Sequence, residues 1–353
     1  MVTWNNLDTL AAFSKLIQLK DCVNIARAMT GENGAARVKK YSAPMAAGLH
    51  FNYAAKQVND DVLAVLAELA KETQAIDKYK ELLNGAVINT GEKRLVLHQL
   101  ARGQQCDAVV ADGVDKREFY VSQQKKIAAF AKKVHAGEIT NEAGEPYTTV
   151  VQIGIGGSDL GPRAIYLALE NWARVHHTLK MEAKFISNVD PDDAAAVLQS
   201  VDIAHTLFIV VSKSGTTLET LTNETFVKNA IKNAGLEVSK HMLAVTSETS
   251  PLAKGADYMA AFFMDDYIGG RYSSSSAVGG AVLSLAFGPD VFAEILDGAA
   301  ETDKLSLNEN ILENAALLDA LIGVYERNVQ GYLCTAVLPY SVSYTHLTLP
   351  TNR

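Results

Sequence analysis

Residues 148–162 read TTVVQIGIGGSDLGP, an apolar, β-branched run that passes into a glycine-rich turn and then into a helix. Three similar apolar runs follow at 184–187, 207–211 and 242–246, with helical stretches between them. Such runs are typical of parallel strands that are buried on both faces, and the helices between them provide the crossovers. The sequence therefore predicts an α/β fold, a doubly wound parallel sheet flanked by helices, with its sites at the carboxyl ends of the strands.

The segments on either side of this pattern read mostly as helix. Residues 1 to about 115 repeat apolar positions at spacings of three and four, and Asn59 is expected to cap one of these helices. Residues 275–330 are helical again, and residues 332–339 predict one further buried strand. We therefore expect an N-terminal helical region at 1–115, an α/β domain at 116–300, and the helix and first strand of a second α/β domain at 301–341.

Composition and charge argue against several classes of protein. The 353 residues include 32 Lys+Arg and 40 Asp+Glu, a formal net charge of −8, which disfavours a general binder of nucleic acid or of anionic membranes. No apolar run approaches the roughly 18 residues of a spanning helix, and the N-terminus lacks the pattern of a secretion signal. Cys22, Cys106 and Cys334 are far apart without a CxxC pair, so we expect no zinc site, no disulfide scaffold and a cytoplasmic location.

The first segment that could carry chemistry is residues 154–162, GIGGSDLGP, called here the first loop. Its glycines let the backbone turn sharply, and the free N–H groups at the helix start attract an anion. It resembles a dinucleotide-binding loop, but Asp159 stands where the third glycine would be, and its carboxylate opposes a pyrophosphate. A turn needed only for packing is the other alternative, and we favour a site for a small anion or a sugar.

The second loop, residues 212–220, reads SKSGTTLET and also lies between a strand and a helix. Its hydroxyls, its lysine and its glycine at a helix N-terminus form a cradle that suits a phosphomonoester without a metal. The lack of a GxxxxGK[ST] pattern argues against a nucleoside triphosphate. The alternative is a Ser/Thr-rich helix cap with solvated hydroxyls.

The third loop comprises residues 265–279, DDYIGGRYSSSSAVG. Two glycines allow the backbone to bring Arg271 into a cleft, where a guanidinium can stabilise a developing negative oxygen without losing its proton. The alternative is an arginine in a surface ion pair.

These loops, together with NTGEKRLVLH at 89–98, ISNVD at 186–190 and VLPY at 337–340, resemble the phosphoglucose isomerase family. The resemblance covers about residues 1–340, and GGRYS is its most specific part. It implies two sugar-isomerase (SIS) domains, each a parallel sheet flanked by helices, and a homodimer. It also implies interconversion of glucose 6-phosphate and fructose 6-phosphate through a cis-enediol, without metal or organic cofactor.

The resemblance further implies roles for individual residues. Arg271 would stabilise the enediolate and help to keep the general base ionised. The residues that would hold the phosphate and the sugar are Gly157, Ser158, Ser212, Lys213, Ser214 and Thr217. The family's base glutamate, ring-opening histidine and C-terminal lysine lie in motifs that this sequence lacks, so we expect the chain to be inactive. His98 is expected to be a structural histidine.

Residues 342–353 do not resemble the family. They look like the translation of a sequencing adapter, and we hypothesise that they are a non-native tail on a C-terminally truncated member of the family. Two alternatives remain for the function: a non-catalytic sugar-phosphate sensor, and an isomerase of another phosphosugar.

Overall fold

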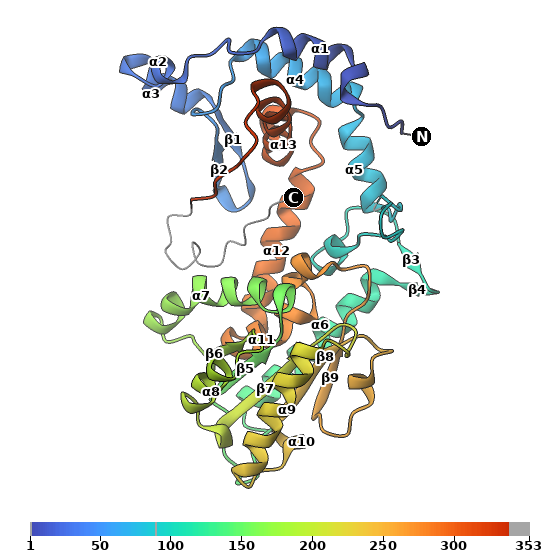
Figure 1. The fold of residues 1–353 in the computed structure, drawn as a ribbon, viewed down its shortest axis with the longest axis vertical. Helices are drawn as coiled ribbons and strands as arrows, with labels where there is room; N and C mark the ends of the chain where they lie inside the picture. The colour runs from blue at the N-terminus through green and yellow to red at the C-terminus, as the bar shows by residue number, and fades with distance from the viewer. Residues whose placement is uncertain (1, 89, 339–353) are drawn as a thin grey trace. The chain divides into compact units, whose positions relative to one another are not determined.

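The computed structural model describes residues 2–88 and 90–338 (Figure 1). Contacts between residues divide the chain into two compact units, which are described separately below. Unit 1 comprises Met1–Ala86, Gln105–Asp107 and Asp297–Val337, and unit 2 comprises Val87–Gln104 and Ala108–Leu296. No helix among the described residues is both long enough and apolar enough to cross a membrane.

Unit 2 contains a five-stranded sheet in the order β6-β5-β7-β8-β9, and all four strand pairs are parallel. Helices cover both faces, which confirms the predicted doubly wound α/β fold (Figure 1). The strands are β5 Thr149–Ile153, β6 Glu182–Ile186, β7 Thr206–Val211, β8 Met242–Thr246 and β9 Ala260–Phe263. The helices are α6 Lys116–His135, α7 Leu160–Val175, α8 Pro191–Gln199, α9 Leu218–Asn233, α10 Val238–His241 and α11 Ala277–Phe287. A small hairpin, β3 Val110–Ala111 and β4 Val114–Asp115, precedes α6.

The central strand β7 shows why the sequence folds in this way. All six of its residues are buried. Leu207, Ile209 and Val211 belong to a core with residues of α6, α7 and α11, whereas Phe208 and Val210 belong to a second core with residues of α8 and α9. Because successive side chains point to opposite faces, a strand with apolar residues at every position must be covered on both sides.

Unit 1 is mainly helical. Its core joins apolar side chains of α1, α4 and α13. The Asn59 side chain accepts a hydrogen bond from the Val62 N–H at 3.0 Å, which confirms the predicted cap of α4. The elements of this unit are α1 Ala11–Gln18, α2 Ile25–Ala28, α3 Gly31–Lys40, β1 Ser42–Pro44, β2 His50–Asn52, α4 Asp60–Glu72, α5 Ala75–Leu83 and α13 Ala315–Tyr325. The boundary between the units lies within α12, Pro289–Leu305.

The strand predicted at residues 332–339 is wrong for the part that the structure describes. Residues 331–338 have no regular secondary structure, and Leu333, Val337 and Leu338 are 75%, 66% and 88% exposed. A strand is stable only when a neighbouring strand pairs with its N–H and C=O groups, and none of the strands that the structure describes pairs with this segment. The hypothesis of a non-native tail at 342–353 falls outside the described residues.

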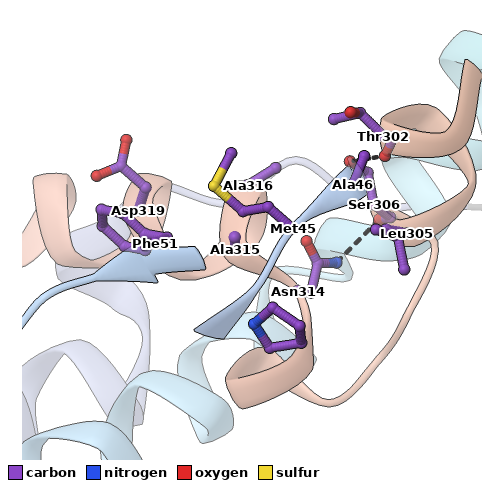
Figure 2. Close-up of a pocket in the computed structure, with 11 residues that line it drawn as sticks. Met45, Ala46, Phe51, Thr302, Leu305, Ser306, Asn314, Ala315, Ala316 and Asp319 are labelled. Carbon is purple, nitrogen blue, oxygen red and sulfur yellow. Dashed lines mark hydrogen bonds between the residues drawn. The ribbon is translucent and has the colours of Figure 1, made fainter. Parts of the chain in front are cut away.

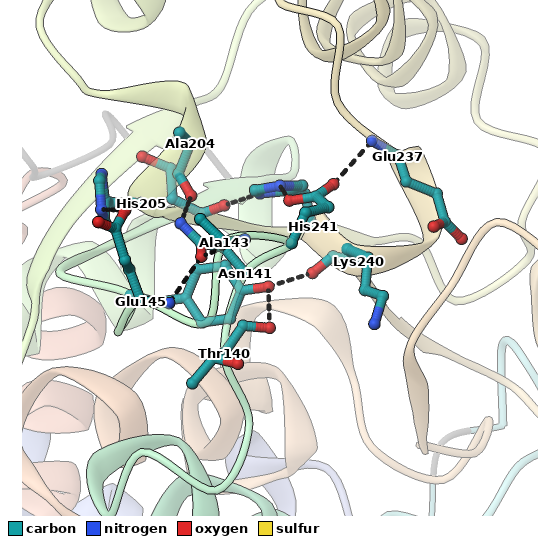
Figure 3. A network of polar contacts seen from close by, with 12 residues as sticks. Thr140, Asn141, Ala143, Glu145, Ala204, His205, Glu237, Lys240 and His241 are labelled. Carbon is teal, nitrogen blue, oxygen red and sulfur yellow. Dashed lines mark hydrogen bonds and ion pairs between the residues drawn. The ribbon is translucent and has the colours of Figure 1, made fainter.

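A polar network lies at the amino-terminal ends of β7 and β8 (Figure 3). The site was predicted at the opposite, carboxyl-terminal ends of the strands. His205 immediately precedes β7, and His241 immediately precedes β8. His205 contacts Glu145 Oε2 at 2.9 Å, and His241 contacts Glu142 Oε2 at 3.1 Å. Both glutamates belong to the segment 140–145, so two histidine–carboxylate contacts attach this segment to the sheet.

Candidate functional site

Unit 2 places the three predicted loops at the carboxyl ends of its strands. The first loop follows β5, the second follows β7 and the third follows β9. In a parallel sheet these ends lie at one edge, where the loops can meet.

Close backbone approach explains the glycines of the first loop. A Cβ at Gly157 would lie 2.3 Å from the carbonyl carbon and oxygen of Gly270 in the third loop. The Ser273 hydroxyl lies 3.1 Å from the Gly157 carbonyl oxygen and 2.7 Å from that of Gly270, and these two acceptors share its proton. The first and third loops are therefore packed directly against each other.

Asp159 has a structural role in the first loop. Its side chain is buried, and its Oδ1 accepts a hydrogen bond from Arg163 Nε at 2.9 Å and lies 2.7 Å from Arg163 Nη2 in an ion pair. Burial raises the pKa of the Asp159 carboxyl, and the charge of Arg163 opposes that shift. A buried carboxylate at this position is unsuited to a pyrophosphate, which disfavours the dinucleotide alternative.

Hydrogen bonds of hydroxyl groups within the second loop stabilise its conformation. The buried Ser212 hydroxyl donates to Thr217 Oγ1 at 3.2 Å and accepts from the Gly215 N–H at 3.2 Å. The exposed Ser214 hydroxyl accepts from the N–H and the hydroxyl of Thr216. Thr217 occupies the N-cap position of α9, but its side chain makes no capping hydrogen bond. The helix-cap alternative therefore does not account for the hydroxyl of Thr217.

Asp265 anchors the third loop. Its carboxylate accepts hydrogen bonds from the Tyr120 hydroxyl at 2.9 and 3.1 Å and from the Tyr267 N–H at 3.1 Å, and it lies 3.4 Å from Lys116 Nζ. Burial raises the pKa of Asp265, while the Tyr120 hydrogen bond and the Lys116 charge oppose the shift. The Leu97 N–H donates to the Tyr267 carbonyl at 2.9 Å, which brings the segment after residue 89 to the same place.

A cavity of about 390 Å³ lies among these segments. Lys213 of the second loop and Arg271 of the third loop both line it, together with Arg94, Glu92 and Asp266. Arg271 is exposed, as a residue that meets a ligand from solvent should be. The structure therefore brings together two of the predicted site residues and adds a third cation, Arg94.

Other predicted site residues do not line this cavity. The residues outside its lining are Gly157, Ser158, Ser212, Ser214 and Thr217. Ser214 lines the adjoining cavity of about 700 Å³, and Ser158 is half-buried next to Gly157 at the contact with the third loop. Their roles remain predictions. Arg94 was not among the residues predicted for the site, although it lies in the stretch 89–98 that resembles the family.

His98 is half-buried and stacks on the ring of Tyr272, with ring centroids 4.9 Å apart and planes inclined by 20°. This contact holds the segment 90–98 against the third loop next to Arg271. It agrees with the structural role expected for His98.

Two further cavities differ in chemistry. A cavity of about 700 Å³ in unit 2 adjoins the first and shares Lys213, Asp266 and Tyr267 with it. A cavity of about 190 Å³ in unit 1 is lined by side chains such as Met45 and Phe51, with Asp319 as its one charged lining residue (Figure 2). The unit 1 cavity offers no cation for a phosphate. Among the described residues, no group of three or more His, Cys, Asp or Glu side chains is placed to hold a metal ion.

Comparison with known proteins identifies the family. A sequence model described as phosphoglucose isomerase matches residues 52–350. The chain belongs to the phosphoglucose isomerase family. A glucose-6-phosphate isomerase from Treponema denticola is 57% identical over 342 residues, or 96% of this chain, and one from Borreliella afzelii is 44% identical over 355 residues, or 98% of this chain. A crystal structure of a glucose-6-phosphate isomerase from Chlamydia trachomatis matches 97% of this chain with a TM-score of 0.86 and 34% identity.

The match confirms the resemblance to the phosphoglucose isomerase family and the SIS-type fold. The chain spans 64% of the length of the T. denticola relative, 66% of that from B. afzelii and 65% of the C. trachomatis chain. The relatives are therefore longer proteins.

Proposed function

We propose that this chain is part of a glucose-6-phosphate isomerase, which interconverts glucose 6-phosphate and fructose 6-phosphate through a cis-enediolate. The observation that carries the proposal is the cavity where Arg94, Lys213 and Arg271 meet at the carboxyl ends of the strands. Three cations around one hollow suit a phosphorylated, hydroxyl-rich ligand. The names of the T. denticola and B. afzelii relatives support the same reaction.

In this proposal some residues bind the phosphate and the sugar, and one stabilises the enediolate. The hydroxyls of Ser158, Ser214 and Thr217, with the backbone N–H groups of Gly157 and Lys213, bind the phosphate and the sugar, and Ser212 holds Thr217 in place. The Arg271 guanidinium stabilises the negative oxygen of the enediolate, because a fixed cation acts most strongly where charge develops.

The base and the ring-opening histidine of the family belong to motifs that the printed sequence lacks. We therefore expect the 353-residue chain to bind glucose 6-phosphate without converting it.

Calorimetry with glucose 6-phosphate, and with glucose as the control that lacks the phosphate, tests the proposed site. We expect binding of the phosphate ester alone, and Lys213→Ala, in the loop that binds the phosphate, should weaken it about tenfold or more. Equal binding of both sugars would contradict the phosphate site. A coupled assay for fructose 6-phosphate should detect no turnover, and turnover by this chain would show that its base lies within these 353 residues.

The substrate, the location and the assembly belong to the same proposal. A cytoplasmic homodimer is what the family resemblance implies. Sedimentation measures the assembly, and fractionation of the source cells measures the location. Turnover of glucose, mannose and glucosamine 6-phosphates, measured with the chain extended to the full length of its relatives, identifies the substrate. Binding without turnover in that longer chain would favour the sensor alternative.

A further inference from the structure

Asp266 lines two adjoining cavities of unit 2 and contacts a cation from each of two segments. Its Oδ1 is 3.3 Å from Lys213 Nζ in the second loop and 3.4 Å from Arg94 Nη1. All three residues line the cavity of about 390 Å³ that also contains Arg271. One carboxylate oxygen therefore forms ion pairs with two of the three cations of the candidate site.

These ion pairs are open to water. The side chains of Asp266, Arg94 and Lys213 are 58%, 44% and 34% exposed. Ion pairs at such exposure contribute little net free energy, because water and salt compete with them. A ligand with more negative charge than one carboxylate can therefore displace Asp266 from both cations.

The neighbouring Asp265 has the opposite surroundings. Its side chain is 16% exposed, and it accepts from Tyr120 and from the Tyr267 N–H. Asp265 accounts for the anchoring of the third loop. Asp266 has no comparable set of buried hydrogen bonds, since the contacts that the structure describes for its carboxylate are the two exposed ion pairs.

We propose that Asp266 is a positioning and selectivity residue that acts as an internal competing anion. In the unliganded protein it holds the side chains of Lys213 and Arg94 at the cavity, and the dianionic phosphate of a sugar phosphate, bound by the second loop next to Lys213, competes with it for these two cations. A monoanion offers the cations no more charge than Asp266 already does, so the carboxylate favours dianions that bring further contacts through their sugar. The sugar phosphate in this inference is taken from the proposed function. The competition between Asp266 and a bound anion does not depend on the sugar.

The test compares Asp266→Asn with the unchanged 353-residue chain by calorimetry. The ligands are inorganic phosphate, sulfate and glucose 6-phosphate, each at low and at physiological salt. We expect Asp266→Asn to bind inorganic phosphate about three- to tenfold more tightly, because a negative charge has left the neighbourhood of two cations. The preference for glucose 6-phosphate over inorganic phosphate should fall. Asp266→Glu, which restores the charge, should return both quantities toward those of the unchanged chain.

Glu248→Gln is the matched control. Glu248 lines the adjoining cavity of about 700 Å³ and loses the same charge on substitution, so it should leave phosphate affinity within about twofold of the unchanged chain. An equal gain in this control would mean that net charge, and not the contact of Asp266, sets the affinity, and it would overturn the proposal.

The remaining outcomes are also decisive. Weaker or unchanged phosphate binding by Asp266→Asn, phosphate binding by neither chain, or failure of this variant to fold would each overturn the proposal, since we assign the anchoring of the loop to Asp265. Tighter phosphate binding without any binding of glucose 6-phosphate would support the role of Asp266 and reject the proposed function.

Discussion

At the scale of single residues, the contact between Gly157 and Gly270 fixes the distance between the first and third loops. Gly157→Ala would place a Cβ 2.3 Å from backbone atoms that cannot rotate away. Overpacking of this kind costs about 1–3 kcal/mol, so urea unfolding should show a lower midpoint, and affinity for the sugar phosphate should fall with it. Gly298→Ala is the control, because a Cβ there meets nothing within 4 Å and should be neutral or stabilising by up to about 1 kcal/mol. Equal midpoints for both variants would contradict this account.

Two serines of the second loop separate structure from binding. Ser212→Ala removes the buried acceptor of the Gly215 N–H, which should lower the free energy of unfolding by about 1–3 kcal/mol. Ser214 is exposed, so Ser214→Ala should change stability by less than about 0.5 kcal/mol while weakening sugar-phosphate binding. Urea unfolding and calorimetry on both variants measure the two effects. The reverse pattern would show that Ser214 shapes the loop.

At the scale of elements, Asn314 connects the end of α12 to the start of α13. Its Nδ2 donates to the carbonyl of Ser306 at 2.9 Å (Figure 2) and to that of Asn308 at 2.8 Å, and its Oδ1 accepts from the Leu317 N–H at 3.0 Å. Because this side chain is 1% exposed, Asn314→Ala should cost about 2–3 kcal/mol in denaturant unfolding. The exposed cap Asn310 is the control, and its alanine variant should cost about 1 kcal/mol or less. Similar costs would refute the importance of burial.

The segment 140–145 should respond to pH through His205. Both ring nitrogens face carboxylates, Glu145 and Asp202, each at 2.9 Å, so both must donate and the ring must be cationic. The hydrogen bond to Asp202 is the main reason why the pKa of His205 is raised above its ordinary 6.5. The stabilisation is therefore complete below pH 6.5 and is lost as pH rises through the raised pKa.

His205→Gln should accordingly lower the free energy of unfolding more at pH 6 than at pH 9. The difference should be under about 1 kcal/mol, because Glu145 and Asp202 are largely exposed. Hydrogen exchange in residues 140–145 should show the same dependence. His177→Gln, at an exposed position, is the control, and a pH-independent effect of His205→Gln would contradict the cationic ring.

The same elements show what the sequence could predict. The strands β5, β7 and β8 were predictable because each is a short, mostly apolar run that contains β-branched residues and is buried at every position. The strand β9 was not predicted, since its sequence, AAFF, has no β-branched residue. The loops after β5 and β7 were recognised from local composition, but the meeting of Gly157 with Gly270 and the arrival of Arg94 at the cavity depend on tertiary packing, which local periodicity does not encode.

At the scale of the whole molecule, the segment 332–338 shows the limit of local patterns most clearly. Its apolar, β-branched character predicted a strand, yet its backbone is unpaired by any described strand and its side chains are exposed. Strand formation needs hydrogen-bond partners from elsewhere in a protein. The chain spans about two-thirds of the length of its relatives from T. denticola and B. afzelii.

This exposed segment should make the chain self-associate. Leu333 and Leu338 are 75% and 88% exposed, and burying a leucine side chain is worth about 1.5–3 kcal/mol. Light scattering with size-exclusion chromatography should therefore show a mass that rises with concentration, and the double variant Leu333→Lys/Leu338→Lys should reduce that rise. Leu218→Lys is the control, because Leu218 is also 75% exposed but lies at the start of α9, outside this segment. If the control reduces association as much as the double variant, exposure of single leucines and not the unpaired segment drives it.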